Sequence, residues 1–468
     1  MQCGRRPATT LRVVPLPICD GEGKGVPPGL PSPPPLPLSA LAFPETVMIR
    51  TLLLTTAAVL MAGPVLAQSA DAAGEAQVRR ILERTPLIDG HNDLPWALRQ
   101  EHGNDPHAVD LTTNLEASTD LHTDIPRLRA GGMGGQFWSV YVPASMTPPD
   151  AAVATFEQID TVKRLVAAHP DVFELATTAD DIQRIHRRGR IASLIGMEGG
   201  YSIDDSLGLL REFYDSGARY ITLTHSRTTT WADSATDAPK WGGLSPFGEE
   251  VVREMNRLGM MVDLSHVSEE TMLDAMRVSD APVIFSHSSA RAVTGHARNV
   301  PDSVLRLMPQ DGGVVMVTFV PGFVSETVRS WNSARSAEDA RLKSLNPGDP
   351  AAVTAGLATW TAANPIPGAT VADVVAHIQH VRDVAGIDHV GIGGDFDGVD
   401  ALPVGLEGVD DYPRLLAALM AEGWTEADIR KLAGENVLRV MRAVEATAAS
   451  RRGERPNLAQ LPAAGAPE

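Results

Sequence analysis

Histidine and carboxylate side chains recur at the ends of short apolar runs in this chain. Seven of them stand at, or within a few residues of, the end of such a run: His91, Asp93, Glu198, His225, His266, His287 and Asp395. Imidazole and carboxylate groups together are a ligand set that suits zinc and similar divalent ions. If the runs are strands that end on one rim, these residues predict a metal-dependent site.

The number of these side chains predicts more than one metal ion. Five or more ligands exceed what one tetrahedral ion with an open catalytic position uses. Two ions that share a carboxylate fit better, and Glu198 is the natural bridge because a carboxylate has two oxygens. Two ions about 3.5–4 Å apart would hold a bridging hydroxide and polarise a carbonyl.

The pair His91 and Asp93 is a weak signal by itself. The same spacing recurs at His122 and Asp124, where no apolar strand precedes it. A lone histidine is also more often structural than a ligand. The prediction therefore depends on the elements that would bring the separate residues together.

Eight short apolar runs alternate with helical patterns along the chain. The runs are Thr85–Asp89, Gly134–Val142, Ile191–Met197, Ala218–Thr224, Gly259–Ser265, Pro282–Ser286, Gly312–Phe319 and His389–Gly394. Strands that alternate with helices predict a parallel sheet, and eight of them predict a closed α/β barrel of the TIM type, (β/α)8. A doubly wound open sheet is the alternative, disfavoured because no glycine-rich phosphate loop follows the first run.

One connection of this barrel is unusually long. About seventy residues separate Phe319 from His389, and helical patterns cover Ser336–Lys343 and Ala351–Ala362 within them. A long insertion after strand seven lies on the functional face and predicts a lid or an oligomer contact, with a homodimer as the candidate assembly. Two extra C-terminal helices are predicted to close the chain, the first ending at Met420 and the second near Ala443.

The N-terminal residues read as a targeting segment. Residues 1–47 are proline-rich and are interpreted as a disordered upstream extension that precedes the true start. Residues 48–67 combine Arg50, an apolar stretch and small residues, the pattern of a signal peptide cleaved after Ala67. An uncleaved anchor is the alternative. Cleavage predicts an exported, periplasmic protein without a stable membrane span. It would also remove both cysteines of the chain, Cys3 and Cys19.

Composition limits the remaining possibilities. The chain has 468 residues, 43% of them hydrophobic, so it can bury a large core. The net charge of −18 argues against a nucleic-acid partner, which requires basic patches. The folded domain is expected over residues 68–446, and residues 447–468 are expected to form a disordered tail.

Eight stretches taken together resemble the membrane (renal) dipeptidase family of dinuclear zinc peptidases, as a bacterial exported member. These stretches are Ile88–Pro95, Gly134–Ser139, Gly196–Gly199, Leu223–His225, Val262–His266, Phe285–Ser288, Arg298–Val300 and Gly391–Gly398. They occur in order and, with the closing helices, span about residues 84–445, so the resemblance covers the whole predicted barrel.

The resemblance implies a specific set of metal ligands. One zinc would be held by His91, Asp93 and Glu198. The other would be held by Glu198, His266 and His287. A water or hydroxide would bridge the two ions together with Glu198.

The resemblance also implies roles for three further residues. His225 would face the substrate and stabilise the oxyanion of the tetrahedral intermediate, and Arg298 would bind the substrate's terminal carboxylate. Asp395 would contact the free amino group and carry protons, so that Asp395, His225 and Glu198 form the catalytic set. Asp397 is the alternative to Asp395, and a surface position is the alternative for Arg298. Three more residues are candidates for the pocket, with ordinary loop or core packing as the alternative: Trp138, Trp231 and His296.

The resemblance implies a zinc-dependent hydrolase that acts on dipeptides with free amino and carboxyl ends. The resemblance implies tolerance of a D-residue at the C-terminal position. One alternative is another metal-dependent amide or lactone hydrolase on the same barrel, although many such enzymes use His-x-His and a carboxylated lysine. A second is a non-catalytic periplasmic peptide-binding protein. The chain also has Phe319 where the mammalian members carry an aromatic hydroxyl, which leaves the preferred dipeptide open.

Overall fold

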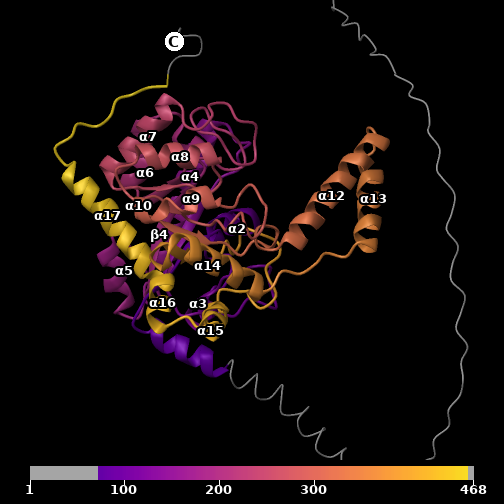
Figure 1. Ribbon diagram of the computed structural model, residues 1–468, viewed down its shortest axis with the longest axis horizontal. Helices are drawn as coiled ribbons and strands as arrows, with labels where there is room; N and C mark the ends of the chain where they lie inside the picture. Colours follow the sequence, from indigo (N-terminus) through magenta and orange to yellow (C-terminus); the bar gives the residue numbers. More distant parts are fainter. Residues whose placement is uncertain (1–71, 462–468) are drawn as a thin grey trace, which may run out of the picture. The chain divides into compact units, whose positions relative to one another are not determined.

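The eight apolar runs form the strands of a closed parallel barrel in the computed structural model, which describes residues 72–461 (Figure 1). The barrel strands are β1 (Leu87–Asn92), β2 (Met133–Tyr141), β4 (Ile191–Glu198), β5 (Ala218–Thr222), β6 (Met261–Asp263), β7 (Ile284–Phe285), β8 (Val314–Val317) and β9 (Val390–Ile392). Each pairs in parallel with its neighbours, and the β2–β4 and β1–β9 pairings close the ring. The predicted (β/α)8 architecture is confirmed.

One short strand was not predicted. β3 (Phe173–Leu175) pairs with the first half of β4, whereas β5 pairs with β4 only from Ile195 onward. β3 therefore extends the sheet beside β4 where β5 has not yet begun. Three residues are too few to give a readable apolar run in the sequence.

Helices connect the strands and surround the barrel (Figure 1). A helix over residues 72–82 precedes β1. The helices that follow are α2 (Leu94–Glu101), α3 (Ile125–Ala130), α4 (Pro148–Ala168), α5 (Ala179–His186), α6 (Leu207–Asp215), α7 (Pro246–Leu258), α8 (Glu269–Val278), α9 (Asp302–Leu305), α10 (Met308–Asp311), α11 (Pro321–Val324), α12 (Glu326–Leu345), α13 (Pro350–Ala363), α14 (Val371–Ala385), α15 (Tyr412–Ala421), α16 (Glu426–Arg430) and α17 (Asn436–Ser450).

Helix α7 illustrates how the sequence sets helix ends. The Ser245 hydroxyl accepts a hydrogen bond from the backbone N–H of Gly248 (3.2 Å), and a proline follows at the first helical position. Gly259 ends the helix with φ +88°, a conformation that favours glycine. Both ends therefore follow from residues that can be recognised in the sequence.

Residues 301–308 do not form one continuous helix. They contain α9 and then the start of α10, with a break near Arg306. Pro309 has no backbone N–H to donate to the carbonyl of Leu305, so one continuous helix would lack that hydrogen bond.

The insertion after the seventh barrel strand, β8, is helical. α12 and α13 pack against each other as a hairpin, with the rings of Trp331 and Trp360 5.6 Å apart, and Figure 1 shows them set away from the helices around the barrel. Only three residues of the two helices are buried: Val328, Leu342 and Val353. The helical pieces predicted here are present, and the hairpin's role as lid or dimer contact stays a prediction.

The C-terminal helix is longer than expected. α17 continues to Ser450, past the tail boundary expected at residue 447. Beyond it, the Asn457 N–H donates to Glu254 of α7 (3.2 Å), and the Asn457 carbonyl accepts from Arg211 (3.0 Å). Residues 451–461 therefore contact the outer helices.

The predicted signal peptide at 48–67 and the preceding residues 1–47 lie outside the described residues. Within residues 72–461, no helix is long and apolar enough to cross a membrane.

Candidate active site and metal centre

The predicted site residues come together at the C-terminal rim of the barrel. His91 lies at the end of β1 and Glu198 ends β4, while the remaining residues directly follow strands or lie in the loops after them: Asp93, His225, His266, His287, Arg298 and Asp395. They adjoin a cavity of about 1020 Å³, which is lined by Asp93, Glu198, His225, His266, Arg298 and Asp395 among others. His91 and His287 lie behind this lining and are fully buried.

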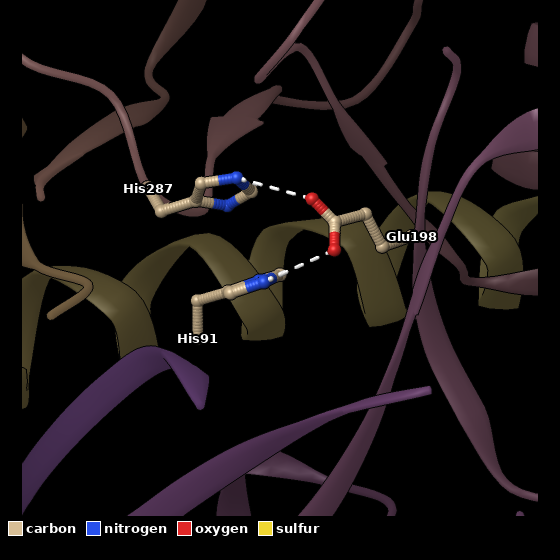
Figure 2. Close-up of side chains that lie close together, drawn as sticks. All are labelled: His91, Glu198 and His287. Atoms are coloured by element: carbon tan, nitrogen blue, oxygen red, sulfur yellow. Dashed lines mark ion pairs between the residues drawn. The ribbon is translucent and has the colours of Figure 1, made fainter. Parts of the chain in front are cut away.

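Glu198 is the centre of the cluster. Its Oε2 atom lies 3.4 Å from Nε2 of His91, and its Oε1 atom lies 3.3 Å from Nε2 of His287. Figure 2 shows the two imidazoles on one side of the carboxylate, each directed at a different oxygen. Oε1 is also 2.9 Å from Nε2 of His266, while Asp93 Oδ2 is 3.3 Å from Nε2 of His91. The two oxygens therefore face two separate groups of candidate ligands.

Several atoms in this cluster lack the partners that buried polar atoms require. Nε2 of His91 and Oδ1 of Asp93 are buried without a hydrogen-bond partner among residues 72–461. Such atoms are unfavourable by about 1–3 kcal/mol each. Nε2 of His266 and Nε2 of His287 also lie only 2.9 Å apart, beside the same carboxylate oxygen. Divalent cations would satisfy all of these atoms, so the residues fit a metal centre.

The Tyr220 hydroxyl fixes the ring orientation of His91. Tyr220 donates its single proton to the carbonyl of Gly90 (3.0 Å), so it accepts a hydrogen bond from Nδ1–H of His91 (3.0 Å). In the neutral ring, Nε2 of His91 then carries the lone pair that faces Glu198. The Tyr220 ring fits inside the barrel because β4 has Gly196 beside it, where a Cβ atom would overlap the ring.

A similar hydrogen-bonded chain supports His287. The Ser286 hydroxyl donates to Oδ2 of the buried Asp263 (2.6 Å) and accepts from Nδ1–H of His287 (2.8 Å). Nε2 of His287 is thereby left unprotonated and directed at Glu198. Such carboxylate or hydroxyl partners on the second ring nitrogen are typical of metal-binding histidines.

Among the residues that adjoin Glu198 and His91, two have left-handed backbone conformations. His266 has φ +69° and Asp395 has φ +66°, a region where residues other than glycine are unfavourable by about 1–3 kcal/mol. Backbone strain of this kind concentrates at functional sites, and here it turns both side chains toward Glu198 and His91.

Three of the proposed ligands, Glu198, His266 and His287, are held in protonation states that suit metal binding. Burial alone would raise the pKa of Glu198, but His91, His266 and His287 bring it well below its usual value. Burial lowers the pKa of His266 and His287 well below the usual value, and Arg298 contributes in the same direction. An ionised carboxylate beside neutral imidazoles is the state that binds a divalent ion. His91 differs, because Tyr220, Asp93 and Glu198 outweigh the effect of burial and raise its pKa well above the usual value, so His91 would release a proton on binding an ion.

The pKa of Asp395 is shifted in the opposite direction from that of Glu198. Burial, followed by the nearby carboxylates of Asp93 and Glu198, raises the pKa of Asp395 to about 8. Its Oδ1 atom lies 4.0 Å from Nε2 of His91. The alternative residue, Asp397, instead accepts a hydrogen bond from the backbone of His122 (2.6 Å). Asp395 is thus the aspartate that adjoins the cluster.

Arg298 is buried without an ion-pair partner among the described residues. It is 2% exposed, Nη1 donates to Ser288 Oγ (3.2 Å), Nη2 donates to the carbonyl of His287 (3.1 Å), and Nε has no partner there. Burial lowers its pKa to about 10. A buried guanidinium on the cavity wall with free donors is suited to bind an anion.

His225 lies at the edge of the cluster. Nε2 of His225 is 3.9 Å from Glu198 Oε1, farther than the corresponding atoms of His266 and His287, and the side chain is 19% exposed. Ligand-type atoms of Glu198, His225 and His266 all lie within 4.8 Å of one another, as do those of His91, Asp93 and Asp395. Geometry alone therefore allows His225 and Asp395 as ligands or as substrate groups.

Sequence reasoning missed several aromatic residues of the cavity. Trp96, Tyr141 and Phe323 line it, and the Tyr141 ring meets the edge of His225 at 4.9 Å. Burial, with Glu198 and Asp93 nearby, raises the pKa of Tyr141 to about 12. The position of Tyr141 at the end of the second apolar run was the signal that could have identified it. The Tyr141 hydroxyl is a candidate to replace the aromatic hydroxyl that Phe319 lacks.

The two tryptophans considered as pocket residues are fully buried core residues instead. Trp138 donates to Ser193 Oγ (3.0 Å), and neither Trp138 nor Trp231 is part of the cavity lining. His296 accepts a hydrogen bond from the backbone N–H of Arg298 (3.1 Å) and stacks on Phe323 at 4.4 Å. It supports the Arg298 loop.

Solved structures of other proteins share this fold. A metallopeptidase named dipeptidase AC is 28% identical, with a TM-score of 0.63, over 77% of this chain and 99% of that chain. A metallopeptidase from Rhodobacter sphaeroides, liganded with a phosphinate mimic of the dipeptide L-Ala-D-Ala, is 26% identical with a TM-score of 0.63 and the same coverage. The probable dipeptidase PvdM from Pseudomonas aeruginosa has the same fold, at 24% identity and a TM-score of 0.68, over 81% of this chain and 100% of that chain.

A family model extends the likeness to nearly the whole described chain. The model of membrane dipeptidases matches residues 75–455, from the helix before β1 to beyond α17. The match includes every strand of the barrel and every residue of the rim cluster. The chain therefore belongs to the membrane dipeptidase family, peptidase family M19, whose members are metal-dependent dipeptidases.

Proposed function

We propose that this metallo-dipeptidase binds two zinc ions on either side of Glu198 and hydrolyses dipeptides that have free amino and carboxyl ends. The observation that supports this proposal most directly is the placement of the Glu198 oxygens. Oε2 faces His91, beside Asp93, and Oε1 faces His266 and His287. One carboxylate placed between two ligand groups is suited to bridge two ions.

Zinc is the proposed metal because the ligand set is nitrogen-rich. Three imidazoles with two carboxylates suit zinc, whereas magnesium and calcium prefer oxygen ligands alone. Two such ions supply a lowered pKa for an attacking water and a polarised substrate carbonyl.

Substrate orientation in this proposal follows from the charged groups of the cavity. Arg298 binds the terminal carboxylate through its free donors, because a guanidinium can hold a carboxylate by two parallel hydrogen bonds. Asp395 lies across the rim, after β9 rather than after β7, and receives the free amino group. These two contacts together select for substrates of two residues.

Proton transfer is assigned to Asp395. It takes the proton of the water that attacks the carbonyl carbon and delivers a proton to the leaving nitrogen as the C–N bond breaks. Its place between His91 and the cavity suits a carboxyl group that carries a proton from the attacking water to the leaving nitrogen. His225 donates a hydrogen bond to the oxyanion of the tetrahedral intermediate, because its ring borders both Glu198 and the cavity.

Two further features are proposed on separate grounds. Acceptance of a D-residue at the C-terminal position is supported by the Rhodobacter sphaeroides neighbour, whose ligand mimics L-Ala-D-Ala. Export to the periplasm is supported by the signal-like sequence at 48–67. Neither depends on the two-metal assignment.

The test of the function is metal removal and restoration. Dialysis against a chelator should abolish hydrolysis of L-Ala-L-Ala and L-Ala-D-Ala, and zinc should restore it. Glu422→Gln, a change at an exposed residue outside the cavity lining, is the control and should lose and regain activity as the parent protein does. Asp395→Asn should retain the metal yet lose turnover. Full activity in metal-free protein, or activity only toward N-acyl amino acids, would contradict the proposal.

A further inference from the structure

One side of the cavity mouth is lined by carboxylates. Five exposed acidic side chains line it there: Glu101, Glu116, Asp120, Asp400 and Glu407. The first three belong to the connection between β1 and β2, and the last two follow β9. β1 pairs with both β2 and β9, so the two connections are neighbours on the rim. We call these five residues the acidic rim.

The acidic rim lacks cationic partners. None of its five residues forms an ion pair with lysine or arginine within residues 72–461, and the cavity lining contains no lysine and only two arginines. Arg127 is 4% exposed and is already bound to Asp124 (2.6 Å) and to the carbonyl of Leu121 (2.7 Å). Arg298 comes from the loop after β7. The negative charge on this side of the mouth is therefore uncompensated.

A buried carboxylate in the same cavity points to a ligand independently of the rim. The Asp397 side chain is 1% exposed and lines the cavity, yet its Oδ2 atom has no hydrogen-bond partner among the described residues. Its other oxygen accepts from the backbone N–H of His122 (2.6 Å). Trp96 also lines the cavity, and an indole face can hold a cation.

The acidic rim lies near the position assigned to the amino end of the substrate. Asp397 and Asp400 belong to the same connection as Asp395, the residue assigned to the free amino group. Arg298, assigned to the terminal carboxylate, belongs to a different connection. A side chain on the amino-terminal residue would thus extend toward the acidic rim. The cavity, at about 1020 Å³, is at the upper end of ligand pockets and has room for a long side chain.

We propose that the acidic rim, with Asp397 and Trp96, is a subsite for the side chain of the substrate's amino-terminal residue, and that it selects a cationic side chain such as lysine or arginine. The inference rests on the proposed dipeptidase function, because that function sets the direction of the substrate. It adds a substrate class that the catalytic groups do not determine.

The test compares dipeptides that differ only in this charge. Lys-Ala and norleucyl-Ala have side chains of similar length and differ by the ammonium group. An exposed ion pair contributes modestly, so several carboxylates acting together should give Lys-Ala about a tenfold higher kcat/KM at low salt. The ratio should decrease toward one at about 0.5 M salt, because exposed charges are screened. Ala-Lys and Ala-norleucine should show no such difference.

Variants of the rim locate the effect. The triple change Glu101→Gln, Asp400→Asn and Glu407→Gln should bring the Lys-Ala to norleucyl-Ala ratio close to one, through a loss of Lys-Ala hydrolysis. Glu422→Gln removes an equally exposed carboxylate outside the cavity and should keep the parent ratio. Asp397→Asn by itself should lower the ratio part of the way toward one.

The outcomes separate this inference from the function on which it rests. Hydrolysis of both peptides with equal kcat/KM, or a lysine preference that survives the triple change, overturns the cationic subsite and leaves the dipeptidase function intact. If no dipeptide is hydrolysed, the proposed function fails. Calorimetry with intact Lys-Ala and norleucyl-Ala then decides the subsite by itself, since equal affinities would overturn it.

Discussion

The role assigned to Arg298 predicts a defined loss that depends on the substrate's terminal carboxylate. Arg298→Lys keeps the positive charge but removes Nε and the planar fork. The guanidinium already donates to Ser288 Oγ (3.2 Å) and the carbonyl of His287 (3.1 Å), so the remaining donors are those free to bind substrate. Lysine retains one point of contact in place of two.

The size of the effect follows from the buried position. A hydrogen bond to a charged group contributes about 1.5–3 kcal/mol. Losing one of two such bonds should lower kcat/KM by about 10- to 150-fold on a free dipeptide. A dipeptide amide offers no carboxylate, so the parent enzyme should hydrolyse it poorly, and Arg298→Lys should change that rate little.

The assay is a cycle of two enzymes and two substrates, Ala-Ala and Ala-Ala amide. Arg306→Lys is the control, because Arg306 is exposed and pairs with Asp302 (3.4 Å) outside the cavity lining. Metal content is measured in parallel. Equal losses on the free dipeptide and the amide would refute the assignment, since the defect would then not involve the carboxylate.

Three other predictions concern the residues around the metal centre and the loop that carries Arg298. His225→Ala should retain the full metal content and lose about 10²–10³-fold in kcat, whereas loss of an ion would make His225 a ligand. Tyr220→Phe should weaken metal binding by about 10- to 100-fold, measured by competition with a chelator, because Nδ1 of His91 loses its acceptor. Gly196→Ala should weaken it at least as much by displacing the Tyr220 ring, and an unchanged affinity in both variants would contradict this orienting role. Burial lowers the pKa of His377 to about 4, whereas the pKa of a histidine in the unfolded chain is near 6.5. In the folded protein the ring is neutral, and its Nδ1 atom accepts a hydrogen bond from the Ala290 N–H (2.9 Å). The unfolded chain therefore binds more protons between these pH values, and this histidine should reduce the free energy of unfolding by up to about 3 kcal/mol as the pH falls from about 6.5 to about 4. His377→Gln should show a flatter dependence in urea titrations of metal-free protein, and parallel curves would contradict the assignment.

The barrel and its rim could be predicted because they depend on local sequence patterns. Parallel strands are buried on both faces and therefore read as continuous apolar runs, which places residues such as Glu198 and His287 at strand ends. Once the fold is a barrel, strand ends share a rim, and residues far apart in sequence become neighbours. β3 gave no such pattern because it has only three residues.

The residues that orient the ligands could not be predicted in the same way. The Tyr220 hydroxyl reaches His91 only because of the strand order and the space above Gly196, which no local pattern encodes. The chain from Asp263 through Ser286 to His287 likewise depends on the pairing of β6 with β7. By contrast, two features could be read from the sequence: Pro309, which follows the helix break near Arg306, and the position of Tyr141 at a strand end.

The central claim is that Glu198 bridges two metal ions, and anomalous diffraction from crystals of the zinc-loaded protein tests it most directly. The account predicts two anomalous peaks about 3.5–4 Å apart, one beside His91 and Asp93 and the other beside His266 and His287, with Glu198 between them. A single peak at full zinc loading, or two peaks that do not both contact Glu198, would contradict it.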